Sequence, residues 1–240
     1  MGGTSLDASL VQNGSPVLYH GAEFEGLPIN IPSLYIHTIG AGGGSLGYLD
    51  QAGALQVGPK SAGALPGPAA YGRGGTEPTF TDAAMAIGYL GVDTPLGGEL
   101  TLDREKSLES LRPIASELGL TVTQLARGMV QISNTKIVGA VRAITIELGH
   151  DPKDFSLLSF GGGGGLVAVD VALDGEEQGR LRLAQRGEEV VGDETGGDGV
   201  DGRRLGPVAD VEEALLADER TVDAHAREGQ LHLLAHGPVS

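Results

Sequence analysis

Three segments of the chain place runs of glycine beside side chains that can bind anions or move protons. Residues 1–5 read MGGTS, residues 34–50 read LYIHTIGAGGGSLGYLD, and residues 159–166 read SFGGGGGL. A glycine loses more conformational freedom on folding than any other residue, so these runs are costly unless something must approach the backbone closely. We therefore expect main-chain N–H groups in these segments to contact a ligand.

The first segment has the groups needed to hold a phosphate. Its backbone N–H groups and the hydroxyls of Thr4 and Ser5 can all donate hydrogen bonds. A glycine-rich lead into an N-terminal strand explains the same residues equally well. The glycines of residues 161–165 can pass beneath an adenine or ribose, or can simply connect a strand to a helix.

His37 is the candidate for proton chemistry in the second segment. It can act as a general base, a metal ligand or a hydrogen-bond donor to a developing charge, with the amides of residues 40–45 completing an anion site. The alternative is a core histidine with satisfied hydrogen bonds beside a structural glycine turn, and for one isolated histidine this is the commoner case.

Residues 72–83, GRGGTEPTFTDA, add a cation and a carboxylate. Arg73 can bind a carboxylate or phosphate through two parallel hydrogen bonds. Asp82 can hold a metal ion or cap the helix that follows, and capping is the better default for an aspartate at this position.

Composition excludes several classes of function. The formal net charge of −16 argues against nucleic acid and anionic membranes as partners, because both require clustered lysine and arginine. The absence of cysteine excludes disulfides, thiolate nucleophiles and cysteine-bound zinc. No apolar run approaches the roughly 20 residues that span a bilayer, and no leader opens the chain, so we expect a cytoplasmic protein. An acidic, lysine-poor surface also suits a halophilic cytosol.

The composition changes near residue 170. Residues 171–240 contain no lysine, tyrosine or phenylalanine, and they include the polar stretch GDETGGDGVDGRRLG. Such a segment can bury little apolar area. We expect a folded domain over residues 1–170 and a poorly ordered acidic tail over residues 171–240.

The expected elements of residues 1–170 alternate between strands and helices. Asn13-Gly14 predicts a tight hairpin within residues 9–19, and two prolines interrupt a strand-like stretch at 27–40. A helix is expected at 81–91, with Thr81 or Asp82 as its N-cap. A second helix is expected at 102–119, where Pro113 should kink or split it. A short strand should then run into the glycines after residue 160.

Residues 121–149 give the clearest helical pattern. Thr121 and Gln124 form the signature of a capping box, and apolar residues recur at helical spacing until Gly149. We expect the apolar face of this helix to pack against the sheet, and it includes Leu125, Met129, Ile132 and Val138.

Taken together, these segments resemble the hydantoinase A/5-oxoprolinase family. The stretches that carry the resemblance occur in the family's order and spacing over residues 1 to about 170: MGGTSLDASLV, IHTIGAGGGS, VGPKSAGALPGPAAYGRGGTEPTFTDA, LDREKS, GHDPKDF and SFGGGGGL. Each stretch is weak evidence by itself, but the combination is highly specific.

The resemblance implies an α/β protein that is part of an actin-like, sugar-kinase-like ATPase domain. It implies ATP, with Mg²⁺, as cofactor: the family phosphorylates the oxygen of a cyclic amide such as a hydantoin or 5-oxoproline, which makes the carbonyl a better target for water. It also implies a hydantoinase B-type partner subunit.

By position, the resemblance implies a phosphate-binding hairpin at the start of the chain, a loop of the catalytic cleft after His37, and an adenosine-side loop after residue 160. Arg73 and Asp82 join His37 as candidate catalytic residues. The cofactor-binding residues carried over are Gly2, Gly3, Thr4, Ser5, Asp7, Gly42, Gly43, Gly44, Ser45, Gly161, Gly162 and Gly164.

The sequence also departs from the family pattern. Tyr35 stands where the family has an acidic residue, Gly165 replaces its proline, and Val167 replaces its second histidine. The family carries a further phosphate loop and a large region upstream, so we expect this chain to supply one side of an ATP cleft, and we expect the resemblance to stop after Gly165. The alternatives are a non-catalytic remnant or partner-binding half-domain, and a subunit of an acetone carboxylase-like enzyme.

Overall fold

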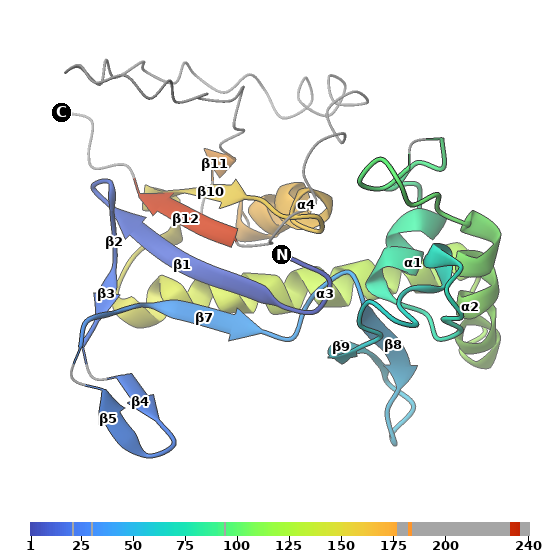
Figure 1. The fold of residues 1–240 in the computed structure, drawn as a ribbon, viewed down its shortest axis with the longest axis horizontal. Coiled ribbons are helices and arrows are strands. Elements are labelled where there is room, and N and C mark those ends of the chain that lie inside the picture. The colour runs from blue at the N-terminus through green and yellow to red at the C-terminus, as the bar shows by residue number, and fades with distance from the viewer. Residues whose placement is uncertain (21, 30, 94, 177–181, 184–230, 236–240) are drawn as a thin grey trace.

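The structure is a computed structural model that describes residues 1–240 except 21, 30, 94, 177–181, 184–230 and 236–240. Its architecture is mixed α/β, as the sequence predicts (Figure 1). A sheet lies along the long helix α3 (Val122–Ile144), and helices α1 (Phe80–Ala86) and α2 (Arg104–Glu117) pack together at one end of it. Helix α4 (Gly165–Glu176) packs on α3 as well.

The main sheet has the strand order β11-β10-β12-β1-β2, and β7 also pairs with β1. β7 pairs with residues 6–9 of β1, and β2 pairs with residues 11–12. β12 is parallel to β1 and antiparallel to β10. The strands are β1 (Leu6–Gln12), β2 (Ser15–Pro16), β7 (Ile36–Ile39), β10 (Phe155–Ser159), β11 (Arg182–Leu183) and β12 (Leu231–Ala235). The first strand of the chain is therefore a central strand of the sheet.

Hairpins extend from this sheet. Asn13 and Gly14 connect β1 to β2 with φ angles of 52° and 75°, which confirms the predicted turn. The strand-like stretch at 27–40 forms three short strands, β5 (Leu27–Ile29), β6 (Ser33–Leu34) and β7; Pro28 lies within β5, and Pro32 directly precedes β6. The smaller strands pair as β3 (Leu18–Tyr19) with β6 (Ser33–Leu34), β4 (Ala22–Phe24) with β5 (Leu27–Ile29), and β8 (Ser45–Leu49) with β9 (Leu55–Ser61).

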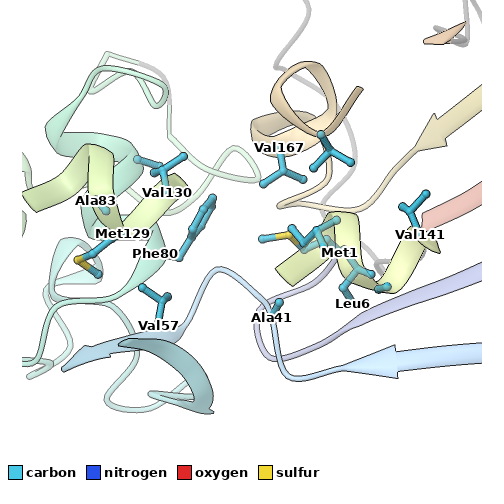
Figure 2. Packing of buried hydrophobic residues seen from close by; sticks show 14 of the residues in the cluster. Met1, Leu6, Ala41, Val57, Phe80, Ala83, Met129, Val130, Val141 and Val167 are labelled. Carbon is cyan, nitrogen blue, oxygen red and sulfur yellow. The ribbon is translucent and has the colours of Figure 1, made fainter. Parts of the chain in front are cut away.

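Helix α3 forms the centre of the hydrophobic core. Its capping box is present, with Thr121 and Gln124 exchanging hydrogen bonds, and Leu125 and Met129 are fully buried. Ile132 and Val138 are partly buried against the same core, so the predicted apolar face is confirmed. Figure 2 shows other residues of this core, with Phe80 of α1 directed toward Val130 of α3 and Met1 beside Val167 of α4. The helix ends at Ile144, and a short 3₁₀ turn (Ile146–Leu148) completes the predicted stretch.

Two helix predictions need correction. α1 begins at Phe80 with Thr79 as its N-cap, so Asp82 is the third helical residue and neither Thr81 nor Asp82 is the cap. Pro113 lies inside the single helix α2, so of the two predicted effects, a kink or a split, the split is absent. Leu111 and Ala115 are buried on either side of the proline, and their packing offsets the hydrogen bond that it cannot donate.

The predicted acidic tail falls mostly outside the described residues. Its described pieces are residues 171–176, which form the end of α4, and the strands β11 and β12, which pair into the main sheet. Residue 170 lies within α4, so the helix crosses the predicted boundary. Over the described residues, no helix combines the length and apolar character required to cross a membrane.

Candidate functional site

The three glycine segments of the sequence meet in the structure. The N–H of Gly43 donates to the carbonyl oxygen of Gly2 at 3.0 Å, and the N–H of Gly44 donates to the oxygen of Gly3 at 2.6 Å. On the other side, the N–H of Gly163 donates to the oxygen of Met1 at 3.0 Å. We call the place where residues 1–5, 40–45 and 161–165 come together the glycine junction.

Gly42 shows why the junction needs glycine. A Cβ atom at this position would lie 2.7 Å from the carbonyl carbon and oxygen of Gly3 and from the nitrogen of Thr4. Those are backbone atoms, which cannot rotate away. Any side chain at position 42 would therefore push the opening segment away from the loop.

The opening segment keeps free hydrogen-bond donors at its exposed turn. Gly3 and Thr4 are both exposed, and their N–H groups make no hydrogen bond to any described residue. The Thr4 hydroxyl lies 3.4 Å from the hydroxyl of Ser61 at the end of β9. The turn thus presents two adjacent amides and a hydroxyl, which is the donor set expected for an anion such as phosphate.

Helix α1 supports the loop of the junction. The carbonyl oxygen of Gly43 accepts 2.8 Å hydrogen bonds from both the N–H and the hydroxyl of Thr81. Within the loop, the N–H of Gly42 donates to the Ser45 hydroxyl at 2.9 Å, and Ser45 is almost fully buried. These contacts fix the loop against the helix. Ser45, which was predicted to bind the cofactor, therefore stabilises the conformation of the loop.

Asp82 is held inside the cap of α1. The carboxylate is fully buried and accepts hydrogen bonds from the Ala69, Ala70 and Thr79 amides and from the Thr79 and Ser107 hydroxyls, at 2.7–3.2 Å. Together with Thr79 it forms a capping box. With both oxygens engaged in this way, the geometry favours the capping role over metal binding.

His37 and Asp7 lie on opposite faces of the strand pair β1–β7. His37 is paired with Ala8, a core residue, so its side chain is on the face turned toward α3. Asp7 is paired with Thr38 on the other face, and the Thr38 hydroxyl donates to the Asp7 carboxylate at 2.6 Å. No hydrogen bond among the described residues joins His37 to the glycine junction.

Arg73 is exposed in the turn that follows the 3₁₀ helix Ala69–Tyr71, and it takes no part in the ion pairs formed between described residues. Tyr71 of the same turn is partly buried. That burial raises the pKa of its phenol, so the hydroxyl stays protonated at neutral pH.

The third segment follows β10, as predicted, and connects it to α4, which agrees with the connecting role that the sequence left open. Gly161 adopts a φ of +85°. Gly163 lies in the predicted glycine run but is not among the cofactor-binding residues carried over individually, and its N–H is the one that donates to Met1. The Ser159 hydroxyl oxygen is buried at the start of this loop without a hydrogen-bond partner among the described residues. It lies 2.7 Å from the position that a Cβ of Gly164 would take. A buried polar atom without a partner beside a glycine loop is a feature that a bound ligand would satisfy.

The described residues contain no group of three or more histidine, aspartate or glutamate side chains placed to hold a metal ion. Asp7 is the predicted cofactor residue that offers a carboxylate, and only its Oδ1 accepts the Thr38 hydroxyl. The sequence analysis did not identify Ser61 or Thr81 as parts of the site, and it included Gly163 only as a member of the run 161–165. Each lies within a stretch that carried the resemblance, but nothing in its spacing indicates its tertiary contact.

Comparison with known proteins identifies the family. A family model described as hydantoinase/oxoprolinase matches residues 1–181. The predicted resemblance is confirmed, and the match continues past Gly165, where we expected it to stop.

Three relatives show the range of this family. The caprolactamase subunit alpha of Pseudomonas jessenii is 43% identical over 173 residues, covering 72% of this chain and 25% of the relative. The acetophenone carboxylase gamma subunit of Aromatoleum aromaticum is 37% identical over 167 residues, covering 68% and 23%. The 5-oxoprolinase of Saccharomyces cerevisiae is 37% identical over 183 residues, covering 72% and 14%.

The fold is also shared with a solved structure. The crystal structure of the ATP-dependent caprolactamase from Pseudomonas jessenii matches with a TM-score of 0.62 at 38% identity, over 70% of this chain and 26% of that chain. This chain spans about a quarter or less of these proteins. It belongs to the hydantoinase/oxoprolinase family.

Proposed function

We propose that this chain contributes the phosphate-binding side of an ATP site in an enzyme that opens a cyclic amide. The observation that carries the proposal is the glycine junction: three segments distant in sequence are packed together and leave the N–H groups of Gly3 and Thr4 free at an exposed turn. Main-chain N–H groups arranged in this way suit the oxygens of a phosphate chain. The relatives support ATP as the nucleotide, since a caprolactamase related to this chain is ATP-dependent.

The proposed fold is one lobe of an actin-like ATPase. In this proposal the turn at Gly3 and Thr4 binds phosphate, and the Gly161–Gly164 loop lies on the adenosine side, where the buried Ser159 hydroxyl would gain a partner. The remaining lobe would come from protein outside this chain, in agreement with the quarter of the caprolactamase subunit that the chain covers. A hydantoinase B-type subunit is the proposed partner.

The glycine junction has no basic side chain of its own to neutralise the negative charge of a triphosphate. Residues 1–5, 40–45 and 161–165 contain no lysine or arginine, and the whole chain carries a formal charge of −16. A triphosphate therefore needs a cation, and we propose Mg²⁺ bound with the nucleotide. Asp7, the second residue of β1, is the carboxylate that we propose to hold its water ligands, because only its Oδ1 accepts the Thr38 hydroxyl.

ATP would supply its γ-phosphoryl group to the amide oxygen. In this step the bond between the γ-phosphorus and the β,γ-bridging oxygen would break, and ADP would be released. Water would then open the ring, and phosphate would leave. The protein's own contribution is to hold the phosphate and the amide oxygen in line. Arg73 is exposed and can move toward a phosphate, so it stays a proposed catalytic residue. His37 lies on the face of the strand pair β1–β7 that is turned toward α3. A catalytic role for His37 requires this strand pair to contact the remaining lobe of the proposed ATPase.

The test is ATP turnover that depends on a cyclic amide. The full chain is combined with a hydantoinase B-type subunit, Mg²⁺ and a lactam or hydantoin, and ADP and ring-opened product are measured. We expect equal amounts of the two products, and no reaction without Mg²⁺. Lactam opening without ATP, or ATP turnover that requires bicarbonate and carboxylates the substrate, would contradict the proposal.

A further inference from the structure

The strands at one edge of the main sheet continue into a ribbon. β7 pairs with β1, and β6, which directly precedes β7, pairs with β3. Between these pairs, the Val17 N–H donates to the Leu10 oxygen at 2.9 Å, and the Tyr35 N–H donates to the Val17 oxygen at 3.1 Å. Figure 1 shows the ribbon extending away from α1 and α2. Because its backbone is paired throughout, successive side chains point to alternate faces.

One face of the ribbon lies on the hydrophobic core. Val17, Tyr35 and Ile39 are partly buried and pack against the core cluster, to which Leu6 and Ala8 of β1 also belong. Helix α3 contacts both β1 and β7 and contributes to the same cluster. This inner face is therefore covered by a helix, as the sheet of a mixed α/β protein requires.

The outer face is apolar as well, and it is open. Leu18 and Leu34 lie directly opposite one another in the β3–β6 pair, and Ile36 follows Leu34 by two residues on the same face. These residues are 49%, 53% and 45% exposed. We call these three residues the apolar stripe. It ends at Thr38, whose hydroxyl donates to the Asp7 carboxylate on this face.

The apolar stripe indicates a surface that another molecule covers. When one face of an antiparallel pair is solvated, that face normally carries polar side chains. Here three neighbouring outward positions are apolar, and Leu27 and Ile31, in the hairpin beyond them, are 68% and 66% exposed. Single exposed apolar residues are common, but a group of them marks an interaction site. A sheet of this class buries its apolar faces against helices, so the expected occupant is an amphipathic helix.

Charge selects among the occupants. Residues 1–59 contain no lysine or arginine, and their acidic residues are Asp7, Glu23, Glu25 and Asp50. A second copy of this chain would bring a further formal charge of −16 to this acidic surface, so electrostatic repulsion opposes self-association through the stripe. A helix with lysine or arginine beside its apolar face would complement both the stripe and its acidic surroundings.

We propose that the apolar stripe is a docking surface for an amphipathic helix of another polypeptide. The apolar face of that helix packs on Leu18, Leu34 and Ile36, and basic side chains lie beside that face. The inference goes beyond the proposed function, because docking on the outer face of the ribbon does not require nucleotide at the glycine junction.

The experiment is a titration of the full ¹⁵N-labelled chain with two synthetic helical peptides of about 18 residues, or five turns. The peptides share one leucine face, and the polar face is lysine in one and glutamate in the other. We expect the lysine peptide to shift the amides of Leu18, Leu34 and Ile36 saturably. We expect it to bind at least about tenfold more tightly than the glutamate peptide.

Matched variants test the role of the stripe. Leu34→Thr and Ile36→Thr should each weaken binding of the lysine peptide at least about fivefold, because each removes apolar contact area without changing the charge. Threonine is a good strand former, so both variants should keep the melting temperature of the wild type. The control Leu148→Thr changes a leucine that is 38% exposed in the 3₁₀ turn Ile146–Leu148, and it should leave the affinity unchanged.

Each other result would overturn the inference. Shifts spread over the acidic surface, or full binding by Leu34→Thr and Ile36→Thr, would show charge attraction without a docking surface. Equal binding of the two peptides, or no binding of either, would contradict the proposed partner chemistry. Analytical ultracentrifugation of the free chain should show a monomer, and a dimer that dissociates on Ile36→Thr would assign the stripe to a second copy instead.

Discussion

The N–H of Gly43 donates a 3.0 Å hydrogen bond to the carbonyl oxygen of Gly2, and this bond joins the opening segment of the chain to the loop after β7. Its neighbour, from Gly44 to Gly3, repeats the contact one residue further on. Two adjacent main-chain bonds fix the direction of the opening turn, so the free amides of Gly3 and Thr4 project from a supported backbone.

The first prediction concerns the space at Gly42. Gly42→Ala places a methyl group 2.7 Å from backbone atoms of Gly3 and Thr4, and we expect a loss of about 1–3 kcal/mol in the free energy of unfolding. Urea denaturation measures this loss. Gly139→Ala is the matched control, because it is an exposed helical glycine with open space around its Cα, and it should stabilise the protein by about 0.5–1 kcal/mol. Equal effects at the two positions would contradict the packing described.

The second prediction separates the hydroxyl of Thr81 from its shape. Thr81→Val keeps the volume but removes the donor to the Gly43 oxygen, and we expect a loss of about 1 kcal/mol in the unfolding free energy. Thr81→Ser retains the hydroxyl and should recover most of the hydrogen-bond contribution. Thermal denaturation of the three proteins is the measurement, and a valine variant as stable as the wild type would show that the hydroxyl does not support the loop.

The third prediction decides between a structural and a catalytic Asp82. In the wild type, both oxygens of Asp82 accept hydrogen bonds from backbone N–H groups. Asp82→Asn replaces one of these oxygens with an NH₂ group, which cannot accept them, so we expect a loss of at least about 2 kcal/mol in the unfolding free energy. Asp93→Asn, at an exposed position, should change it by less than about 0.5 kcal/mol. A fully stable Asp82→Asn protein that lacks activity would contradict the capping role and restore the catalytic one.

The fourth prediction concerns pH and the hairpin β8–β9. Hydrogen bonds from the Ala54 N–H and the Gln56 side chain lower the pKa of Asp50. Because the folded pKa is below the unfolded one, the stabilisation is fully present above the unfolded pKa and is lost as the pH falls through the folded pKa.

Hydrogen exchange at the Ala52 and Ala54 amides measures this effect locally, since both donate to Asp50. We expect their protection factors to fall in acid in the wild-type protein. In Asp50→Asn they should be lower at neutral pH and nearly independent of pH over the same range. Identical pH profiles for the two proteins would show that the carboxylate does not hold the turn.

The sequence was informative where local chemistry determines structure. The Asn13-Gly14 turn, the capping box at Thr121 and the buried face of α3 follow from φ preference, hydrogen bonding and helical periodicity, and all are present. The family resemblance gave each glycine segment a role at an ATP cleft, but it did not predict their direct packing on one another. Nor did it predict their partners Ser61 and Thr81, because a tertiary hydrogen bond leaves no periodic signal in the sequence.

The position of His37 illustrates a second limit. In the stretch LYIHTI both alternating faces carry apolar residues, Leu34 and Ile36 on one and Tyr35 and Ile39 on the other. The alternation therefore does not indicate which face is buried. The pairing with β1 decides it, since Ala8 and Leu6 belong to the core and lie opposite His37 and Ile39.

The pairing of β12 between β1 and β10 could not be predicted either. Residues 231–235 are a short apolar run within a segment of otherwise polar composition. A run of that length is compatible with several structures, and a partner far away in the sequence determines which one forms.

The central claim is that the turn at Gly3 and Thr4 binds the phosphates of ATP, and the most direct measurement is a titration of the full ¹⁵N-labelled chain with Mg²⁺–ATP. We expect saturable shifts at the amides of Gly3, Thr4 and the glycine junction, loss of binding when Mg²⁺ is chelated, and weaker binding to Gly42→Ala than to Gly139→Ala. Saturable binding whose shifts lie away from the junction, or no binding at millimolar nucleotide, would contradict the account.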